Sequence, residues 1–187
     1  MPYTATPTTL PDVLILEPKV FTDERGFFYE SFNAVEFQRV TGKSVAFVQD
    51  NHSKSAKGIL RGMHYQIQHP QGKLVRVIAG EVQDVVVDLR RSSPYFGKSV
   101  SVDLSAANRR QLWVPPGFAH GFLVLSDGAE FLYKATDYYH PEHERSLFWS
   151  DPALGIPWRL DAIAPEAPQL KAKDIAGAPL ASAETFP

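Results

Sequence analysis

Short apolar runs alternate with turn residues through the middle of the chain. Residues 73–78 are rich in valine, leucine and isoleucine and end at Ala79-Gly80, and residues 82–89 follow with three consecutive valines. β-branched runs on either side of a glycine turn favour a hairpin of two strands. Further short strands are predicted at residues 100–104, 111–114, 121–125 and 130–138, with a second hairpin turn at residues 126–128.

One segment has a helical pattern instead. Apolar side chains stand at Ala34, Phe37 and Val40, while Asn33 precedes them as an N-cap residue and Gly42 follows as a stop signal. Many short strands at close spacing are typical of an antiparallel sandwich or barrel. We therefore expect an all-β fold with a few short helices.

The length of 187 residues suits a single domain, and no linker, repeat or low-complexity tract divides the chain. We predict one domain over residues 1–187. Its C-terminal tail, about residues 162–187, is rich in alanine, proline and lysine, and we expect it to wrap around the domain. A disordered terminus is the alternative for this tail.

Charge and composition exclude several classes of protein. The 19 basic and 21 acidic residues give a net charge of −2, which argues against a general nucleic-acid binder or a membrane-surface binder. The chain has no cysteine, so disulfides, thiolate catalysis and cysteine-ligated metals are ruled out. Neither a secretory signal nor an apolar run of membrane-spanning length is visible, and we expect a cytoplasmic protein.

The first cluster of candidate functional residues contains Arg61, His64 and Lys73 on two adjoining strands. Buried cations are costly unless they are paired, so this cluster implies either an anionic ligand or an exposed face. A lone histidine in a strand can also be purely structural. Arg61 and His64 point to opposite faces of a regular strand, and a β-bulge at Gly62 is needed to bring them together.

A second cluster surrounds His120, which follows the tight turn Pro115-Pro116-Gly117. This pattern resembles the second motif of the cupin superfamily of small jelly-roll barrels. The first cupin motif would then fall on His64 and Gln66, where the usual second histidine is missing. Two histidines without cysteine make a poor zinc or iron site, so we expect a cupin without metal. A metal-binding cupin stays open as an alternative.

Two further segments could carry chemistry. Tyr133 lies on a predicted strand, and with a reference pKa of about 10 it could act as an acid in a barrel interior. Half-buried packing is the structural alternative for this tyrosine. Residues 21–32 combine aromatic side chains with an arginine, which suits a surface for a base and a phosphate. A core edge strand with a solvated turn is the alternative there.

Six motifs, in order along the chain, resemble the dTDP-4-dehydrorhamnose 3,5-epimerase family. They are FxDERGFFxE, QDNHSxSxxGxLRGxHYQ, QGKLVRV, GxVxDVxVDLRxxSPxFGK, WVPPGFAHGFxVLS and YKxTDYYxPExE. The resemblance implies a cupin barrel, that is a double-stranded β-helix or jelly roll. It also implies an isomerase that needs no cofactor. Such an enzyme inverts C3 and C5 of dTDP-4-dehydro-6-deoxy-D-glucose and gives dTDP-4-dehydro-L-rhamnose for dTDP-L-rhamnose synthesis.

The resemblance also assigns site residues. His64 is the implied base, Asp174 orients it, Tyr133 is the acid on the opposite face of the sugar, and Lys73 lies near the keto oxygen and stabilises the enolate. No metal is implied. The implied substrate contacts are Phe21, Arg25, Glu30, Gln49, Asp50, Asn51, Arg61, Lys73, His120, Tyr139, Glu144 and Lys173.

The family resemblance further implies a homodimer. The N-terminal segment, about residues 1–35, is expected in the dimer contact, and residues 21–30 are expected to reach into the site of the neighbour. Residues 170–174 read Leu-Lys-Ala-Lys-Asp where the family has Leu-Ser-x-Lys-Asp. Three alternatives remain from the sequence: a 3-only or 5-only epimerase of a related sugar nucleotide, a non-catalytic sugar-nucleotide-binding cupin, and the metal-binding cupin.

Overall fold

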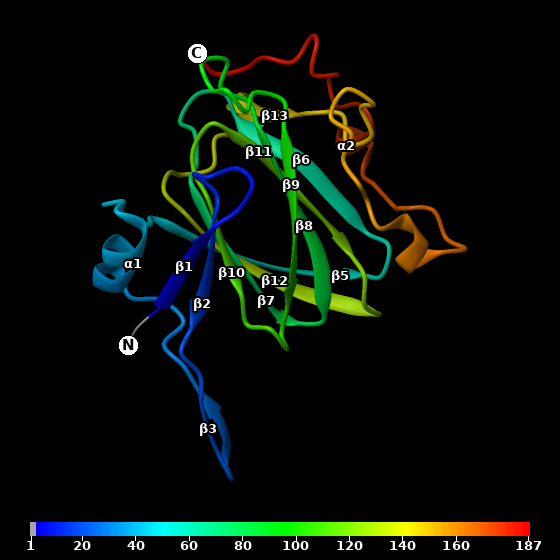
Figure 1. Cartoon of the computed structure of the whole chain (residues 1–187). Coiled ribbons are helices and arrows are strands. Elements are labelled where there is room, and N and C mark those ends of the chain that lie inside the picture. Colours follow the sequence, from blue (N-terminus) through cyan, green and yellow to red (C-terminus); the bar gives the residue numbers. More distant parts are fainter. Residues whose placement is uncertain (1–2) are drawn as a thin grey trace.

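Two antiparallel β-sheets face each other and close into a jelly-roll barrel (Figure 1). The computed structural model describes residues 3–187. The strands are β1 (Tyr3–Pro7), β2 (Leu14–Pro18), β3 (Phe21–Asp23), β4 (Gly26–Phe28), β5 (Gln49–Ala56), β6 (Leu60–Gln66), β7 (Lys73–Ala79), β8 (Glu81–Asp88), β9 (Ser99–Ser105), β10 (Gln111–Val114), β11 (Phe118–Val124), β12 (Gly128–Ala135) and β13 (Glu144–Ser146). The helices are α1 (Ala34–Thr41), α2 (Ala172–Ile175) and the 3₁₀ turns η1 (Pro141–His143) and η2 (Leu160–Ile163).

The larger sheet has six strands in the order β1-β2-β10-β7-β12-β5, and the smaller has five in the order β13-β6-β11-β8-β9. Strand alternation gives each sheet an inner and an outer face. Val75 and Phe131 of the larger sheet pack against Val86 and Phe122 of the smaller one in the interior. The rings of Phe122 and Phe131 stack with their centroids 4.3 Å apart. These contacts form the core that holds the two sheets together.

The two hairpins predicted from the sequence are wrong, although their strands exist. β7 belongs to the six-stranded sheet and β8 to the five-stranded sheet, and β11 and β12 are divided in the same way. The tight turns are therefore corners at which the chain passes from one sheet to the other. The Ser126 hydroxyl joins the two corners, because it accepts a hydrogen bond from the Glu81 amide (2.8 Å) and donates one to the Gly128 carbonyl (2.9 Å).

Gly80 explains why the first corner is so tight. Its φ is +76°, and a Cβ at this position would lie 2.0 Å from the Gly128 carbonyl oxygen. Only glycine tolerates both the left-handed backbone and this close approach. The remaining strands match the prediction with small shifts: β11 begins earlier, at Phe118, and β12 ends at Ala135 rather than at residue 138.

The predicted helix is confirmed as α1. The Asn33 side chain accepts hydrogen bonds from the amides of Val35 and Glu36 at its start, and Gly42 ends it with φ +68°. Phe37 is buried on its inner face and meets Trp113 edge to face at 5.2 Å. The helix thus covers the outer face of the six-stranded sheet beside β1 and β10.

Two segments leave the barrel. The β3–β4 hairpin is exposed along its whole length and extends away from the sheets (Figure 1). After β13 the chain crosses the outer face of the five-stranded sheet, where Leu180 and Phe186 pack against a cluster that includes Tyr65 and Val87. Within residues 3–187, no helix is long and apolar enough to cross a membrane.

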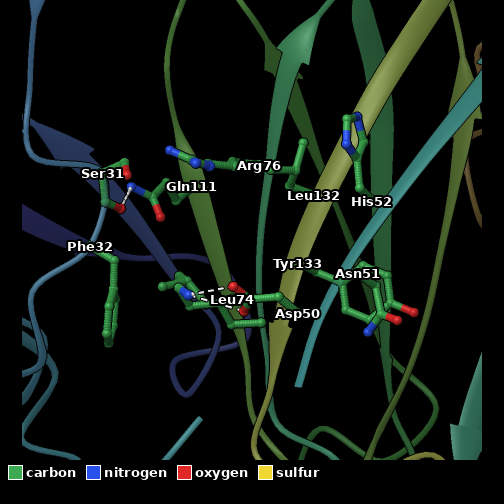
Figure 2. Close-up of a pocket in the computed structure, with 11 residues that line it drawn as sticks. Ser31, Phe32, Asp50, Asn51, His52, Leu74, Arg76, Gln111, Leu132 and Tyr133 are labelled. Carbon is green, nitrogen blue, oxygen red and sulfur yellow. Dashed lines mark hydrogen bonds and ion pairs between the residues drawn. The ribbon is translucent and has the colours of Figure 1, made fainter. Parts of the chain in front are cut away.

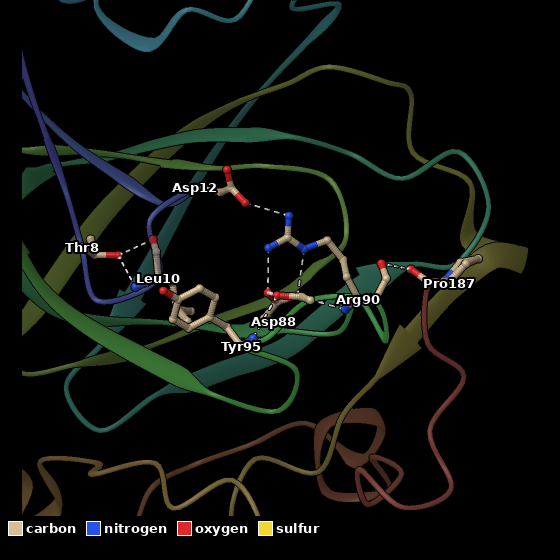
Figure 3. A network of polar contacts seen from close by, with 9 residues as sticks. Thr8, Leu10, Asp12, Asp88, Arg90, Tyr95 and Pro187 are labelled. Carbon is tan, nitrogen blue, oxygen red and sulfur yellow. Dashed lines mark hydrogen bonds and ion pairs between the residues drawn. The ribbon is translucent and has the colours of Figure 1, made fainter.

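A charged network fastens the N-terminal loop to the end of β8 (Figure 3). Arg90 donates hydrogen bonds to both carboxylate oxygens of the fully buried Asp88 (2.9 and 2.7 Å) and one to Asp12 (2.8 Å). Ser93 donates a further hydrogen bond to Asp88 (2.6 Å). Burial alone would raise the pKa of Asp88, but these hydrogen bonds outweigh it and lower the pKa. Asp88 is therefore a buried, ionised and paired carboxylate.

Candidate functional site

One end of the barrel interior is lined by charged and polar side chains instead of apolar ones. They come from both sheets: His64 on β6 and His120 on β11 belong to the five-stranded sheet, and Lys73 on β7 and Tyr133 on β12 belong to the six-stranded sheet. His64 and His120 are register partners, so their side chains lie next to each other. Lys73 and His120 line one small interior cavity of about 10 Å³.

His64 pairs with a carboxylate that is far away in the sequence. Its Nε2 lies 2.5 Å from Oδ1 of Asp174, a separation of 110 residues. Asp174 is only 2% exposed, on the short helix α2 that packs on β6. When Nε2 carries the shared proton, Nδ1 keeps the lone pair of the ring and can accept a proton.

A β-bulge brings Arg61 to the same face as His64. On β11, His120 pairs with His64 and Phe122 pairs with Arg61, so three steps on β6 match two on β11. Gly62 lies at this bulge with φ +130°, and a Cβ there would meet Gly121 at 2.5 Å. The bulge expected from the sequence is thus confirmed. Arg61 donates a hydrogen bond to the Ser55 hydroxyl (3.0 Å) inside the barrel mouth.

Lys73 and Tyr133 lie together on the opposite wall. The Lys73 ammonium is 5.9 Å from the centre of the Tyr133 ring. Burial lowers the pKa of Lys73 to about 8, with Glu144 and Asp84 opposing the shift. Burial, assisted by Glu144, raises the pKa of the Tyr133 phenol. At neutral pH the lysine is therefore mostly a cation and the tyrosine holds its proton.

A second histidine–carboxylate pair lies deeper in the interior. Nε2 of His120 is 2.9 and 3.0 Å from the two carboxylate oxygens of Asp84, which is completely buried on β8. Burial raises the pKa of Asp84, while His120 and Lys73 oppose that shift. The sequence analysis did not single out Asp84. Its only signal was a carboxylate inside the valine-rich run of residues 82–87.

The mouth of the barrel carries a chain of polar contacts. Lys173 places its ammonium 3.0 Å from both carboxylate oxygens of Glu144, and the Tyr139 hydroxyl donates to the same carboxylate (3.0 Å). Burial would raise the pKa of Glu144, but Lys173, His64 and Tyr139 reverse this and lower it.

Asn51 and Asp50 are neighbours in sequence but face opposite sides of β5. The buried Nδ2 of Asn51 has no hydrogen-bond partner within the described chain, while its Oδ1 accepts a hydrogen bond from Gln49 (3.1 Å). This free donor is available to a ligand. Asp50 binds Lys134 on the outer face (3.0 Å). Strand alternation therefore separates Asp50 from the interior residues with which the sequence analysis grouped it.

A hollow of about 150 Å³ on the outer face of the six-stranded sheet contains Asp50 and is bordered by Ser31 and Phe32 (Figure 2). Arg76, Gln111 and residues of β12 also line it. His64, His120 and Lys73 are not among the residues that line this hollow, whereas Asn51 and Tyr133 are.

Three predicted binding residues lie away from the interior in this chain. Phe21 and Arg25 belong to the protruding β3–β4 hairpin, where the Arg25 side chain is 86% exposed and pairs only with Asp23. Glu30 follows the hairpin, and its backbone carbonyl accepts a hydrogen bond from the Tyr3 hydroxyl (2.9 Å). A single chain does not bring these residues to His64.

The interior contains the groups needed for proton transfer beside a carbonyl. The His64–Asp174 pair can remove a proton, the neutral Tyr133 can supply one, and the Lys73 ammonium can stabilise negative charge on an oxygen between them. Arg61 and Lys173 add positive charge at the mouth, where an anionic part of a ligand would bind.

Comparison with known proteins finds close relatives over nearly the whole chain. The family model described as dTDP-4-dehydrorhamnose 3,5-epimerase matches residues 7–182. A Pseudomonas aeruginosa protein named dTDP-4-dehydrorhamnose 3,5-epimerase is 57% identical over 183 residues, which is 98% of this chain and 99% of the relative. A protein of the same name from Salmonella typhimurium is 60% identical over 174 residues, 92% of each chain.

Solved structures agree with this similarity. The crystal structure of dTDP-6-deoxy-D-glucose-3,5-epimerase from Legionella pneumophila, in complex with dTDP-4-keto-L-rhamnose, superposes with a TM-score of 0.93. It is 52% identical in sequence, and the match covers 97% of this chain and 95% of the other.

Proposed function

This chain belongs to the dTDP-4-dehydrorhamnose 3,5-epimerase family, and we propose from this that it inverts C3 and C5 of dTDP-4-dehydro-6-deoxy-D-glucose. The product is dTDP-4-dehydro-L-rhamnose, a precursor of dTDP-L-rhamnose. The bound product in the Legionella pneumophila structure, at 52% identity and a TM-score of 0.93, supports this substrate class. The same reasoning makes the chain an isomerase.

The chemistry of the substrate sets the requirements. C3 and C5 both adjoin the C4 ketone, and a proton on either carbon is acidic only because the resulting charge delocalises onto the carbonyl oxygen. The site must therefore hold a base near the carbon and a cation near the oxygen. Inversion also requires a proton to return from the other face of the ring, so a second acid must stand opposite the base.

The hydrogen bond between His64 and Asp174 is the observation that carries the proposal. It fixes the ring of His64 and leaves Nδ1 as the basic atom. The buried carboxylate also stabilises the imidazolium that forms when His64 takes the proton from C3 or C5. We assign His64 as the base and Asp174 as its positioning residue.

Lys73 and Tyr133 complete the reaction. The Lys73 ammonium would bind the C4 oxygen and stabilise the enolate, while the neutral phenol of Tyr133 would return a proton to the face opposite His64. Both side chains lie on the six-stranded sheet and His64 lies on the five-stranded sheet, so a sugar ring between the sheets has the base and the acid on different sides.

Other side chains are assigned to binding. Arg61 and Lys173 would contact the diphosphate, and Tyr139 would stack on the thymine base. The free Nδ2 of Asn51 would donate to the substrate. The binding set within one chain is Gln49, Asn51, Arg61, Lys73, His120, Tyr139, Glu144 and Lys173.

The missing contacts would come from a second copy of the chain. The β3–β4 hairpin carries Phe21 and Arg25 away from its own barrel and exposes Phe27 and Phe28 at 60% and 63%. We propose a homodimer in which each hairpin enters the other site and supplies Phe21, Arg25 and Glu30. A cytoplasmic location is also part of this proposal, and the absence of cysteine is consistent with it.

The test is incubation with dTDP-4-dehydro-6-deoxy-D-glucose in heavy water, followed by NMR of the product. We expect deuterium at both C3 and C5 and the L-rhamno configuration. His64→Ala is expected to abolish incorporation at both positions. His52→Ala is the matched control, because this exposed histidine pairs with Glu130 outside the barrel, and its variant should retain full activity.

The alternatives give different labels. Deuterium at one carbon only would identify a 3-only or 5-only epimerase. No deuterium with retained substrate binding would identify a sugar-nucleotide-binding protein. Normal labelling of C3 and C5 by the His64→Ala variant would contradict the assigned base.

A further inference from the structure

Three metal-ligand side chains gather on two loops at the barrel mouth, outside the residues assigned to epimerisation. They are His69, Asp137 and His140, and their ligand atoms all lie within 4.8 Å of one another. Nδ1 of His69 is 3.6 Å from Oδ2 of Asp137. Within residues 3–187 no other group of three histidine or carboxylate side chains is arranged to hold a metal ion.

A buried glutamine holds both loops in place. Gln66 is 4% exposed, and its Nε2 donates to the backbone carbonyls of His69 (2.7 Å) and Tyr138 (3.2 Å). Its Oε1 accepts a hydrogen bond from the backbone amide of His140 (2.8 Å). Both histidines are therefore positioned by the side chain that stands where metal-binding cupins carry their second histidine.

Asp137 is fixed by a second glutamine. Nε2 of Gln71 donates to the Asp137 backbone carbonyl (2.8 Å), and the Asp137 side chain accepts from the amide of Tyr138 (2.8 Å). All three ligand-type residues thus stand on backbone that is held by hydrogen bonds, while their side chains reach solvent. This arrangement reduces the conformational entropy that metal binding would cost.

The histidine rings are already close together. The rings of His69 and His140 stack with centroids 4.4 Å apart, and the His143 ring lies 5.7 and 6.1 Å from them. Ligands of a tetrahedral zinc ion, bound at about 2.0–2.2 Å, lie about 3.3 Å from one another. The gap of 3.6 Å between His69 and Asp137 needs to close by only a few tenths of an ångström, and the ligand atom of His140 already lies within 4.8 Å of both.

We propose that His69, Asp137 and His140 form a binding site for a divalent metal ion of the zinc type. Two imidazole nitrogens and one carboxylate oxygen suit zinc and its borderline neighbours cobalt and nickel, whereas calcium and magnesium prefer oxygen ligands. Water or the nearby His143 completes the coordination. The site is distinct from the barrel histidines, whose Nε2 atoms are bonded to Asp174 and Asp84.

The experiment is a titration of the full-length chain, without a histidine tag, with Co²⁺ alone and with Zn²⁺ alone. Visible absorption reports the Co²⁺ coordination, and calorimetry reports the affinity for both ions. We expect one ion per chain. His69→Ala and His140→Ala should each weaken binding at least tenfold, and His52→Ala should leave it unchanged. Circular dichroism of each variant, all at exposed or half-buried positions, confirms that the fold is retained.

His64→Ala separates this site from a metal in the barrel interior and should bind Co²⁺ as the unaltered chain does. Loss of Co²⁺ binding in that variant would place the ion in the interior and overturn the proposal. The absence of saturable binding at millimolar Co²⁺, or equal affinity in the two loop variants and the unaltered chain, would also overturn it. Activity plays no part in these outcomes, so they are independent of the proposed epimerase function.

Discussion

At the residue scale, burial divides the interior side chains into proton donors, proton acceptors and fixed charges. Tyr133 keeps its proton because a phenolate is poorly solvated between the sheets and lies near Glu144. Lys73 stays charged only as long as the pH is below its lowered pKa. A conservative substitution can remove the proton of Tyr133 or the titratable ammonium of Lys73. The change in activity that results should show which step of the reaction depends on that group.

Tyr133→Phe removes the proposed acid and keeps the ring. His64 still removes protons, so exchange of deuterium into the substrate should continue. Inversion should fall by about 10²–10⁴-fold, the usual contribution of a general acid, with the larger loss at C5. NMR of the product in heavy water measures both quantities. Unchanged product stereochemistry at an undiminished rate would contradict this role.

The Lys73 ammonium predicts a loss of activity in alkali. Burial lowers the pKa of Lys73 to about 8, Lys173 lowers it further, and Glu144 and Asp84 raise it. The charge that stabilises the enolate is present below about pH 8 and is lost as the pH rises through that value. The rate constant kcat/KM should therefore decline above pH 8. Lys73→Arg should be slower but should lack this decline, because a guanidinium stays charged.

Protein stability provides the control for this pH profile. An unfolded lysine has a pKa of about 10.4, so between about pH 8 and pH 10 the unfolded chain binds more protons than the folded one. The contribution of Lys73 to stability therefore rises over the range in which activity falls. If kcat/KM of the unaltered chain and of the Lys73→Arg variant declined equally above pH 8, the decline could not be assigned to Lys73.

At the element scale, the β3–β4 hairpin is the clearest case of a segment whose function lies outside its own barrel. It carries Arg25 and Phe21 into solvent, and its Phe27 ring contacts Tyr29 at 5.8 Å and the Arg109 guanidinium at 4.3 Å while staying 60% exposed. Exposed aromatic rings of this kind indicate a contact with another surface. The proposed exchange of hairpins predicts that two different inactive chains can repair each other.

Mixing tests this exchange. Arg25→Ala impairs the hairpin and His64→Ala impairs the barrel, and each homodimer should have low activity. In a mixed dimer the hairpin of the His64→Ala chain enters the intact barrel of the Arg25→Ala chain, so one complete site forms. After refolding an equal mixture, activity should recover to roughly a quarter of that of the unaltered protein, since about half of the dimers are mixed and hold one site of two. If the refolded mixture were no more active than either variant alone, the exchange of hairpins would be excluded.

Sequence patterns predicted the elements better than their connections. The period of apolar residues located α1 and the strands, and the parity of Arg61 and His64 required the bulge that Gly62 forms. The hairpins at residues 79–80 and 126–128 were wrong, because glycine-rich turns look the same whether a chain doubles back in one sheet or passes to the other. Whether the second strand joins the same sheet or the opposite one depends on packing against strands that are distant in the sequence, so the residues of the turn do not determine it.

The site shows the same limit. Motifs pointed to His64, Lys73 and Tyr133, and only the family resemblance pointed to Asp174. The contact of His64 with Asp174 spans 110 residues, so no local pattern contains it. Asp84 was missed because a single carboxylate in a valine run carries no periodic signal, and its importance appears only when His120 is placed beside it. Asp50 was grouped with the interior residues, although alternation along β5 turns it outward to Lys134.

At the scale of the whole molecule, stability depends on how distant segments are joined to the barrel. Arg90 is the main junction, because it binds Asp88 of β8 and Asp12 of the N-terminal loop and also covers the Phe118 ring at 4.4 Å. Asp88 has no exposed side-chain surface, so its charge relies on these partners (Figure 3).

Arg90→Ala should destabilise the fold by about 3 kcal/mol, since it leaves a buried carboxylate without its main partner. Chemical denaturation at pH 7 measures this loss. The lowered pKa of Asp88 gives the sign of its pH dependence: the pair stabilises the fold above the unfolded pKa of about 3.9 and loses this effect as the pH falls through the folded value. The difference in the free energy of unfolding between the unaltered chain and the Arg90→Ala variant should therefore become smaller at acidic pH.

Two comparisons make this prediction specific. Adding Asp88→Asn to the Arg90→Ala variant should recover part of the stability, because the buried charge is removed. Arg25→Ala, which breaks the exposed pair with Asp23, should leave the unfolding midpoint nearly unchanged. Equal destabilisation by Arg90→Ala at pH 7 and pH 3 would show that its effect is packing rather than charge.

The position of Asp174 has a consequence for the order in which the site forms during synthesis of the chain. Every strand of the barrel precedes this residue in the chain, and α2 reaches β6 only after the polypeptide has passed over the outside of the five-stranded sheet. A growing polypeptide can therefore assemble both sheets on the ribosome while His64 still lacks its carboxylate. We therefore expect His64 to gain its carboxylate partner only after all strands of the barrel have been synthesised.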